Sequence, residues 1–385
     1  MTDVFFTRFI GRISDIRPDS GLFDGQVVEV EVQDWIGFLS EQELGPHEVT
    51  TDKTADEAID EVLIGFPIQP EATDFDTGTE TFPTLFDTDG PASSMASFLS
   101  KMCRNEWGRL YLIADGTLQF QNKTARDAAQ SIGTVDGEMT ELDVEYLRAD
   151  VYPIVQVVVS LASVDANPDR LLWSLAGAPA IQPGQTIEIE CPYTDVEGTQ
   201  GQITAKDIVD PPFYEFGSVQ NFVSDDMHAD LSVDLEVGAT KTLARLTNEN
   251  AGTVGYLNDL QLDGKGIIFA SPLTIERRTE EPIYRGIGER RLVVRLEQIA
   301  DLDTATQRAE DLLAIVGNPE RRAIELRFDA GQSLALAEVA VTLEPSSKIT
   351  VVEDMTGVSG DYFVERLFFS LDAGQLWVTI LASPA

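Results

Sequence analysis

Helical spacing of apolar residues is clearest in one stretch of the chain, at Ala305, Ala309, Leu312, Leu313 and Val316. Just before it, Thr304 and Gln307 have the form of a capping box, in which each side chain binds a free backbone amide of the first turn. Gly317 is placed to end the helix in a left-handed conformation, and Pro319 prevents its continuation. The pattern predicts one central helix over residues 304–316.

Alternation of apolar and polar residues predicts strands in most of the remaining chain. Two of them, Glu289–Leu296 and Ala323–Phe328, flank the helix. Near the N-terminus, Val4–Ile16 and Val27–Gln33 form a predicted hairpin, with valines on one face of its second strand and glutamates on the other. Further strands are expected at Thr186–Cys191, Leu231–Val237, Val254–Leu262 and Ile267–Ala270, the last two joined by a turn at Asp263-Gly264.

Four short apolar segments follow the helix, at Val339–Leu343, Lys348–Val352, Tyr362–Leu371 and Leu376–Leu381. Short turns that contain glycine separate most of them. Their regular spacing predicts a small antiparallel barrel or sandwich at the C-terminal end of the chain.

A different pattern occupies residues 51–124. The capping box Thr54-Ala55-Asp56-Glu57 begins a helix that ends at Ile64. A second helix is expected over Pro91–Trp107, followed by a tight hairpin around Asp115-Gly116. This stretch is therefore predicted to be a small α/β insertion within a β-rich chain.

The expected fold class is β-rich α+β, with antiparallel β-barrel or sandwich domains, a small α/β insertion and one central helix. We divide the chain into β-rich domains at 1–50 and 125–300, the insertion at 51–124, and a helix followed by an antiparallel barrel at 301–385. At 385 residues the chain is long enough for two or three domains with substantial cores.

The most unusual property of the composition is its strongly negative net charge. The 66 acidic residues outnumber the 27 lysines and arginines, which gives a net charge of −39 and a pI of about 4.1. Such an acid excess, with arginine preferred to lysine, suits a protein in concentrated salt, where screening removes the self-repulsion. We favour a halophilic host over a merely acidic protein. The same charge argues against tight sequence-independent binding of nucleic acid.

The sequence offers little catalytic chemistry. The histidines, His47 and His228, lie in polar surroundings and are expected at the surface. Cys103 and Cys191 are expected to be free and to fill the core. A phosphate-binding P-loop is absent, and Ser359 lacks the spacing of a nucleophile elbow. We therefore expect neither enzymatic activity nor a cofactor.

Export and membrane insertion are not expected either. Asp3 and Arg8 interrupt the opening residues, so no signal peptide is predicted. The most apolar run, Ile154–Ala162, is too short to span a membrane. Paired carboxylates abound in so acidic a chain and leave an acidic secreted glycosidase open, although the missing export signal weighs against it.

An acidic loop imitates the start of a calcium-binding EF-hand loop. Thr79 stands where the motif requires glycine, and Leu85 stands where it requires the closing glutamate. A solvated loop is therefore favoured over a calcium site, for which the candidate ligands are Asp74, Asp76, Asp87 and Asp89.

Positive charge is concentrated near the central helix, at Arg277, Arg278, Arg285, Arg290, Arg291, Arg295, Arg321, Arg322 and Arg327. These arginines suit either contact with DNA or pairing with carboxylates of the same or a neighbouring subunit. No aromatic residues interleave them as in a surface that binds single strands. We favour a subunit or partner interface.

Three parts of the chain carry a further pattern, namely Arg8–Ile16 with Asp34–Leu39, Trp107–Phe120, and Pro282–Arg291 followed by Asp301, Ala305–Leu313 and Asn318-Pro319. Together they resemble tailed-phage baseplate hub or tail-tip proteins over about half the chain. The acidic composition favours a haloarchaeal virus among these.

This resemblance implies a structural virion protein, a homotrimer whose β-domains of tail-tube type form a ring at the tail tip. Such a hub extends the tail tube, carries tip or fibre proteins and opens for the passage of viral DNA. The implied partners are the tail tube or distal tail protein, the tape measure protein and the tip or fibre proteins. The implied location is the virion, with assembly in the host cytoplasm.

The alternative function is a receptor- or carbohydrate-binding β-protein of the same tail tip. An exposed platform of aromatic side chains would favour it. The tryptophans are instead expected in the core or at strand edges, at Trp35, Trp107, Trp173 and Trp377.

Overall fold

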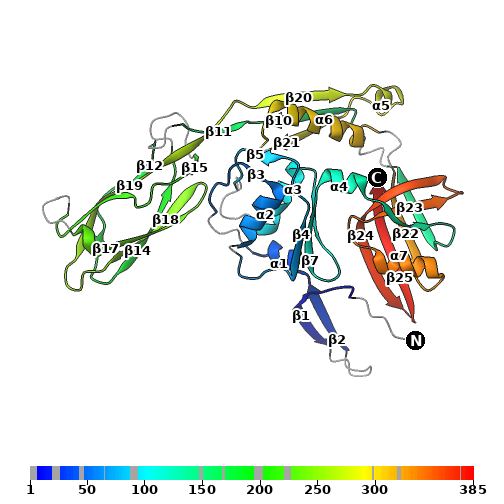
Figure 1. Ribbon diagram of the computed structural model, residues 1–385, viewed down its shortest axis with the longest axis horizontal. Coiled ribbons are helices and arrows are strands. Elements are labelled where there is room, and N and C mark those ends of the chain that lie inside the picture. Colours follow the sequence, from blue (N-terminus) through cyan, green and yellow to red (C-terminus); the bar gives the residue numbers. More distant parts are fainter. Residues whose placement is uncertain are drawn as a thin grey trace.

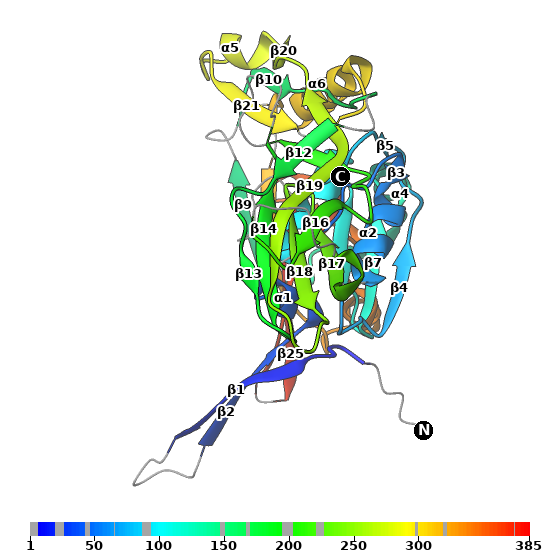
Figure 2. The same cartoon turned by 90° about the vertical axis from the view of Figure 1, so that its left-hand side faces the viewer.

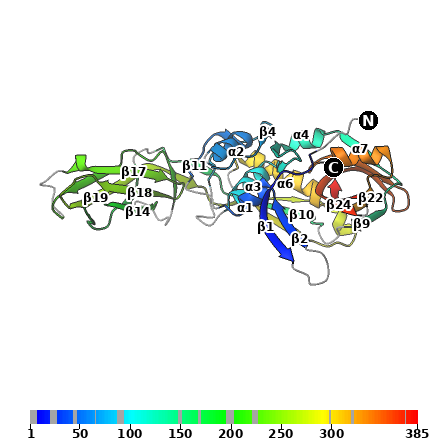
Figure 3. The ribbon, with the colours of Figure 1, turned by 90° about the horizontal axis from the view of Figure 1, so that it is seen from below.

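The computed structural model describes residues 7–19, 27–42, 47–64, 66–86, 94–146, 151–166, 170–194, 203–220, 227–296, 299–318, 322–372 and 374–385. An α/β unit, residues 34–122 and here called the central unit, lies in the middle of the molecule (Figure 1). A β-sandwich extends to one side of it and a C-terminal sheet lies on the other (Figure 3). The predicted β-rich α+β fold is confirmed, and none of the sheets in the described part of the chain closes into a barrel.

The central unit consists of helices packed on two small sheets. Its elements are α1 (Trp35–Ser40), β3 (Lys53–Thr54), α2 (Ala55–Ile64), β4 (Ala72–Phe75), β5 (Thr81–Phe82), α3 (Met95–Asn105), β6 (Arg109–Leu112) and β7 (Thr117–Gln121). Half of the predicted capping box is present, because Thr54 N–H donates to the Glu57 carboxylate at 3.2 Å, while the Thr54 hydroxyl donates to Asp56 at 2.6 Å. Helices α2 and α3 bury their apolar sides against β7 around Phe98 and Leu118. The predicted hairpin at Asp115-Gly116 is confirmed as β6 and β7.

A three-stranded sheet carries the central helix. Strand β10 (Ile154–Val159) pairs antiparallel with β20 (Leu273–Arg278) and parallel with β21 (Arg291–Leu296), and the short helix α5 (Glu281–Tyr284) follows β20. The central helix is α6 (Leu302–Val316), which packs its alanines and Leu312 on the valines of β10.

Helix α6 is confirmed and ends at Val316 as predicted, but its first residue and the conformation of Gly317 differ from the prediction. It begins two residues earlier, because Asp301 rather than Thr304 is the cap and accepts the Thr304 amide at 2.7 Å. Gly317 has a φ of −82°, so the helix does not end in a left-handed residue.

The sandwich is inserted between β10 and β20. Its strands are β11 (Ala162–Val164), β12 (Arg170–Ser174), β13 (Ala180–Ile181), β14 (Thr186–Pro192), β15 (Thr204–Lys206), β16 (Phe213–Gly217), β17 (Leu231–Val237), β18 (Lys241–Asn248) and β19 (Gly255–Phe269), with the 3₁₀ turn η2 (His228–Asp230) before β17. Strand β19 pairs with β11, β12, β13, β15 and β16, and this sheet faces the sheet β14-β18-β17 across a shared core.

The turn predicted at Asp263-Gly264 is wrong, because β19 runs through both residues without a break. Asp263 pairs with Leu171 and Gly264 with Arg170. A Cβ on Gly264 would lie 2.9 Å from side-chain atoms of Ile208 and Leu172. The glycine therefore allows close packing inside the sandwich rather than a change of chain direction.

The C-terminal sheet is open and has the order β8-β23-β24-β25-β22-β9, with helix α7 on one face. Its elements are β8 (Ser131–Val135), β9 (Glu141–Tyr146), β22 (Arg322–Asp329), α7 (Leu334–Thr342), β23 (Lys348–Glu353), β24 (Val358–Asp372) and β25 (Gln375–Pro384). The expected barrel is thus replaced by an open sheet. Since β8 and β9 lie far earlier in the chain than the other strands, the sheet joins two of the predicted domains, and the domain division itself stays a prediction.

The strand predicted at Val339–Leu343 is wrong, because most of this segment is the last part of α7. Ser333 caps the helix by accepting the Leu336 amide at 3.2 Å. Leu336, Val339 and Ala340 then face the sheet. A short apolar run does not distinguish a buried strand from a buried helix by periodicity alone.

The predicted N-terminal hairpin is confirmed, with β1 (Arg12–Asp19) and β2 (Val27–Gln33) antiparallel, but its first strand begins at Arg12 rather than Val4, and residues 7–11 are not part of it. Asp34 follows β2 and caps α1, as its position predicts, by accepting the Gly37 amide at 2.6 Å. Figure 2 shows the hairpin projecting from one end of the molecule, away from the sheets. We call it the β1–β2 hairpin.

A buried arginine on α6 ties the central unit to the three-stranded sheet. Arg308, whose side chain is 5% exposed, donates to Glu80 at 3.0 Å and lies 3.9 Å from Asp311. Its charge also acts on the fully buried Glu106, which accepts the backbone N–H of Thr79. Burial raises the pKa of Glu106, and the hydrogen bonds from Thr79 and the charge of Arg308 only partly offset this rise.

A second polar contact ties the central unit to the C-terminal sheet. Glu365 on β24 pairs with Arg109 of β6 and with Arg126 of α4 (Lys123–Ala128), both at 2.9 Å. Ser383 donates to the same carboxylate at 2.6 Å. Burial raises the pKa of Glu365, but the Ser383 hydrogen bond and the two arginine charges outweigh it, so the pKa is lowered.

The substitution Arg308→Leu should lower the free energy of unfolding by about 3 kcal/mol, because it leaves the Glu80 carboxylate without its partner and removes the positive charge that acts on buried Glu106. Tryptophan fluorescence during urea unfolding measures this change, since Trp107 packs in the adjoining core. Adding Glu106→Gln should recover part of the loss. The control Glu310→Ala removes an exposed ion pair on the same helix and should cost less than about 1 kcal/mol. An unchanged urea midpoint in Arg308→Leu would contradict the structural role of the pair.

The substitution Glu365→Gln should cost about 2 kcal/mol near neutral pH, because it weakens charged hydrogen bonds in a partly buried contact. Since the pKa of Glu365 is lowered on folding, its contribution is present above the pKa of the unfolded chain and is lost as the pH falls through the folded value. The difference in the free energy of unfolding between wild type and variant should thus be the same near pH 7 and near pH 5. It should shrink below about pH 4.

Urea unfolding at these pH values measures this difference. Glu325→Gln, at an exposed position of the same sheet, is the matched control and should change the free energy of unfolding little at any pH. A difference in the free energy of unfolding that grows in acid would contradict the lowered pKa of Glu365.

Candidate interaction surfaces

Three of the predicted interface arginines share one face of the three-stranded sheet. Ile154 of β10 pairs with Arg278 on one side and Arg291 on the other, while Val158 pairs with Arg295. Residues directly opposite each other in a sheet point to the same face, and α6 covers the other face through Val155, Val157 and Val159. We call Arg278, Arg291 and Arg295 the arginine face.

Carboxylates of the same chain satisfy part of this face. Arg278 pairs with Glu280 at 2.5 Å and with Glu289 at 2.9 Å. Arg291 lies 3.7 Å from Glu276. Among the described residues Arg295 is exposed and makes no ion pair within 4 Å. The face therefore keeps positive charge for a further partner.

The other predicted arginines do not join this face. Arg277 lies on the α6 side of the sheet and pairs with Glu310 at 2.9 Å. Arg285 pairs with Glu281 at 2.7 Å, and the Arg290 guanidinium lies 5.4 Å from the centre of the Tyr152 ring.

The last three positions belong to another part of the fold. Arg327 lies on β22 of the C-terminal sheet, where its guanidinium stacks 4.5 Å above the ring centre of Trp377. Arg321 lies outside the described residues. Arg322 begins β22, and only its backbone is described. The run of arginines in the sequence is thus divided between two sheets.

Two of the candidate calcium ligands bind amides of the same chain. Asp74 accepts the side-chain amide of Gln119 at 3.1 Å, and Asp76 accepts the backbone amide of Asn122 at 3.3 Å. The other two, Asp87 and Asp89, lie outside the described residues. In the part of the chain that the structure describes, no three metal-ligating side chains converge, and no helix is long and apolar enough to cross a membrane.

The histidines differ from each other in their surroundings. His228 is exposed as predicted and stacks on Tyr214, with 4.0 Å between the ring centres. His47 is half-buried against Phe98 rather than at the surface. Burial lowers the pKa of His47, although the charge of Glu61 opposes this, so the ring is neutral in the folded chain at neutral pH. The predicted free, buried cysteines are confirmed.

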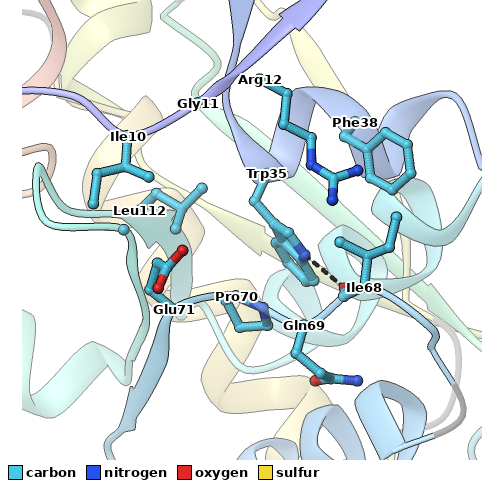
Figure 4. Close-up of a pocket in the computed structure, with 11 residues that line it drawn as sticks. Ile10, Gly11, Arg12, Trp35, Phe38, Ile68, Gln69, Pro70, Glu71 and Leu112 are labelled. Atoms are coloured by element: carbon cyan, nitrogen blue, oxygen red, sulfur yellow. Dashed lines mark hydrogen bonds between the residues drawn. The ribbon is translucent and has the colours of Figure 1, made fainter.

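A small hollow lies at the root of the β1–β2 hairpin (Figure 4). Its lining is mostly apolar and includes Trp35, which donates to the Ile68 carbonyl at 2.9 Å. The Arg12 guanidinium lies 5.2 Å from the centre of the Phe38 ring beside it. The volume of about 140 Å³ is well below the roughly 300–1,000 Å³ of small-molecule sites. The hollow suits one apolar side chain rather than a cofactor.

Exposed apolar side chains mark two further surfaces that the sequence did not single out. One lies on the β1–β2 hairpin, and the other lies at the end of β24 and β25. By contrast, the tryptophans offer no exposed platform for a sugar or receptor, since all of them are half-buried, at Trp35, Trp107, Trp173 and Trp377.

Comparison with known proteins reveals similarity in fold but not in sequence. No protein-family model matches the chain, and no curated protein matches it significantly. A tail protein from Neisseria meningitidis MC58 superposes with a TM-score of 0.55 at 11% identity, over 98% of this chain and 80% of its own. The 43 kDa tail protein of prophage MuSo2 from Shewanella oneidensis gives a TM-score of 0.51 at 10% identity, over 96% and 76%. The chain thus has the fold of these two tail proteins.

Proposed function

We propose that this chain is a structural virion protein, the baseplate hub at the tail tip of a tailed virus. There it extends the tail tube, carries tip or fibre proteins and opens for the passage of DNA. The observation that carries this proposal is the fold that the chain shares, over nearly its whole length, with two tail proteins. Its partners are the tail tube or distal tail protein, the tape measure protein and the tip or fibre proteins. It assembles in the host cytoplasm.

The proposed assembly is a homotrimeric ring, with the arginine face at the contact between subunits. With a net charge of −39, the surface of a neighbouring copy is rich in carboxylates. The planar guanidinium of arginine binds a carboxylate through two parallel hydrogen bonds, and exposed Arg295 makes no ion pair of its own in the described chain. Charge complementarity thus favours a second copy at this face.

The acidic charge also suits a channel for DNA. A ring lined by carboxylates makes few attractive contacts with phosphates, so DNA can slide through it without binding tightly. The same charge makes the copies repel one another in dilute buffer, where screening is weak. We propose a halophilic host, because concentrated salt removes this repulsion.

The ring predicts a salt-dependent mass. Light scattering of the purified chain should give the mass of a trimer in molar salt and that of a monomer in dilute buffer. Electron microscopy of the trimer should show a ring with a central opening wide enough for a DNA duplex. A monomer at every salt concentration would overturn the proposed hub.

Loss of the arginine face should weaken the trimer. The triple variant Arg278→Ala, Arg291→Ala and Arg295→Ala should shift the mass in molar salt toward the monomer, because the contact loses its charged hydrogen bonds. The control Arg277→Ala removes an arginine from the opposite face of the same sheet and should leave the trimer intact. An intact trimer of the triple variant that no longer binds host cells would favour the receptor-binding alternative.

A further inference from the structure

The β1–β2 hairpin has one apolar and one charged face. Ile13 pairs with Val32 and Ile16 pairs with Val30, so these side chains point the same way. A bulge at Ser14 brings the two isoleucines, three residues apart, onto this face. Val28 extends the row. These five side chains, which we call the hairpin apolar face, are between 43% and 62% exposed.

The opposite face of the hairpin is polar and already partnered. Asp15 pairs across the strands with Glu31, and Arg17 pairs with Glu29. The Arg17 guanidinium binds Asp15 at 2.6 Å and Glu31 at 3.3 Å. This is the pattern of a sheet with one face in water and one face against a core, but in the described chain no core covers the apolar side. A two-stranded sheet without such a cover is only marginally stable in water.

The root of the hairpin is nevertheless fixed. Arg8 donates to the carbonyls of Val341 at 2.7 Å and Leu343 at 2.9 Å, at the end of α7. Its guanidinium also lies 4.5 Å above the ring centre of Phe369. On the other side, Arg12 stacks over Phe38 of the central unit. The hairpin is therefore held in a set direction, away from the body of its own chain (Figure 2).

The turn-side ends of β24 and β25 lie at the same end of the molecule as the hairpin (Figures 1 and 2), and they carry a second exposed apolar surface. Phe369 pairs with buried Val378, and Leu371 pairs with Leu376, so these side chains continue the core face of the C-terminal sheet past its core. Phe369, Leu371 and Leu376 are 37% to 76% exposed. We call them the strand-end patch. Between Phe368 and Ile380 the sequence has a single charged residue, Asp372.

Charge favours a second copy of this chain as the occupant of both surfaces. Copies with a net charge of −39 repel one another except where each presents an uncharged area, and these two surfaces are such areas. The N-terminal segment already lies on Phe369 of its own chain through Arg8, so this sheet end accepts the segment from which the hairpin begins. The two patches differ, so their contact is heterologous, and a heterologous contact forms a ring when the rotation from one copy to the next closes.

We propose that the hairpin apolar face of one copy docks on the strand-end patch of the next copy around the ring. The inference rests on the proposed homotrimer and names the contact that closes it. Each subunit extends one hairpin and receives one. The apolar face then gains the cover that its own chain does not provide, and hydrophobic burial opposes the repulsion between acidic subunits.

The first test changes the apolar face without changing the fold. The double variant Ile16→Asp with Val30→Asp should weaken trimer formation in molar salt at least about tenfold, because docking would bury carboxylates without partners. Leu371→Asp should do the same from the receiving side. The matched control Glu29→Thr with Glu31→Thr alters the opposite face of β2 and should leave the trimer intact. Far-UV circular dichroism checks that each chain remains folded.

The second test asks which surfaces meet. Chains carrying Ile16→Cys are mixed with tagged chains carrying Leu371→Cys, dissociated in dilute buffer and returned to molar salt under oxidation. A disulfide between tagged and untagged chains is expected, while the wild-type mixture should form none because Cys103 and Cys191 are buried.

These outcomes separate the inference from the proposed hub. A wild-type trimer that survives both aspartate substitutions, or that forms no mixed disulfide, overturns the docking contact and leaves the ring standing. A wild type that is monomeric at all salt concentrations overturns the ring, and the contact between copies with it.

Discussion

The architecture depends on the buried charge pair between α6 and the central unit. Arg308 lies among Glu80, Glu106 and Asp311, and no other described arginine or lysine is fully buried. Removing it would leave Glu80 without its partner and would take away the positive charge that partly offsets the burial of Glu106. The pair therefore fixes how the three-stranded sheet sits on the central unit. Because the sandwich is inserted between two strands of that sheet, its position follows from the same contact.

Each neighbour of the central unit is attached by different chemistry. The C-terminal sheet is held by the partly exposed pairs of Glu365 with Arg109 and Arg126. The sandwich is held by an apolar cluster that includes Phe86 and Ile267. These attachments leave Arg295 without an ion pair among the described residues and leave the apolar strand ends exposed. In a molecule of such negative charge, positive and apolar surfaces are those at which copies can meet, which fits a protein whose proposed role is assembly.

Local signals in the sequence located most of the elements correctly. The caps at Asp34 and Thr54, the row of valines in β2 and the alanine-rich face of α6 each depend on residues a few positions apart, so the sequence alone defines them. The predicted strand at Val339–Leu343 was wrong because this apolar run has no such local signal. The predicted turn at Gly264 was wrong because glycine occurs both in turns and at positions where neighbouring side chains pack closely against the backbone.

The sequence by itself determined the β-rich class, the acidic surface and the presence of an arginine-rich segment. Only the tertiary structure decided which arginines act together, because Arg278, Arg291 and Arg295 meet through strand pairing while Arg327 lies on another sheet. It also decided that Arg308 is buried and that the valines of β2 face solvent. The physical reason is that periodicity shows which side of an element is apolar, whereas burial depends on contacts with distant residues, as from Arg308 to Glu80.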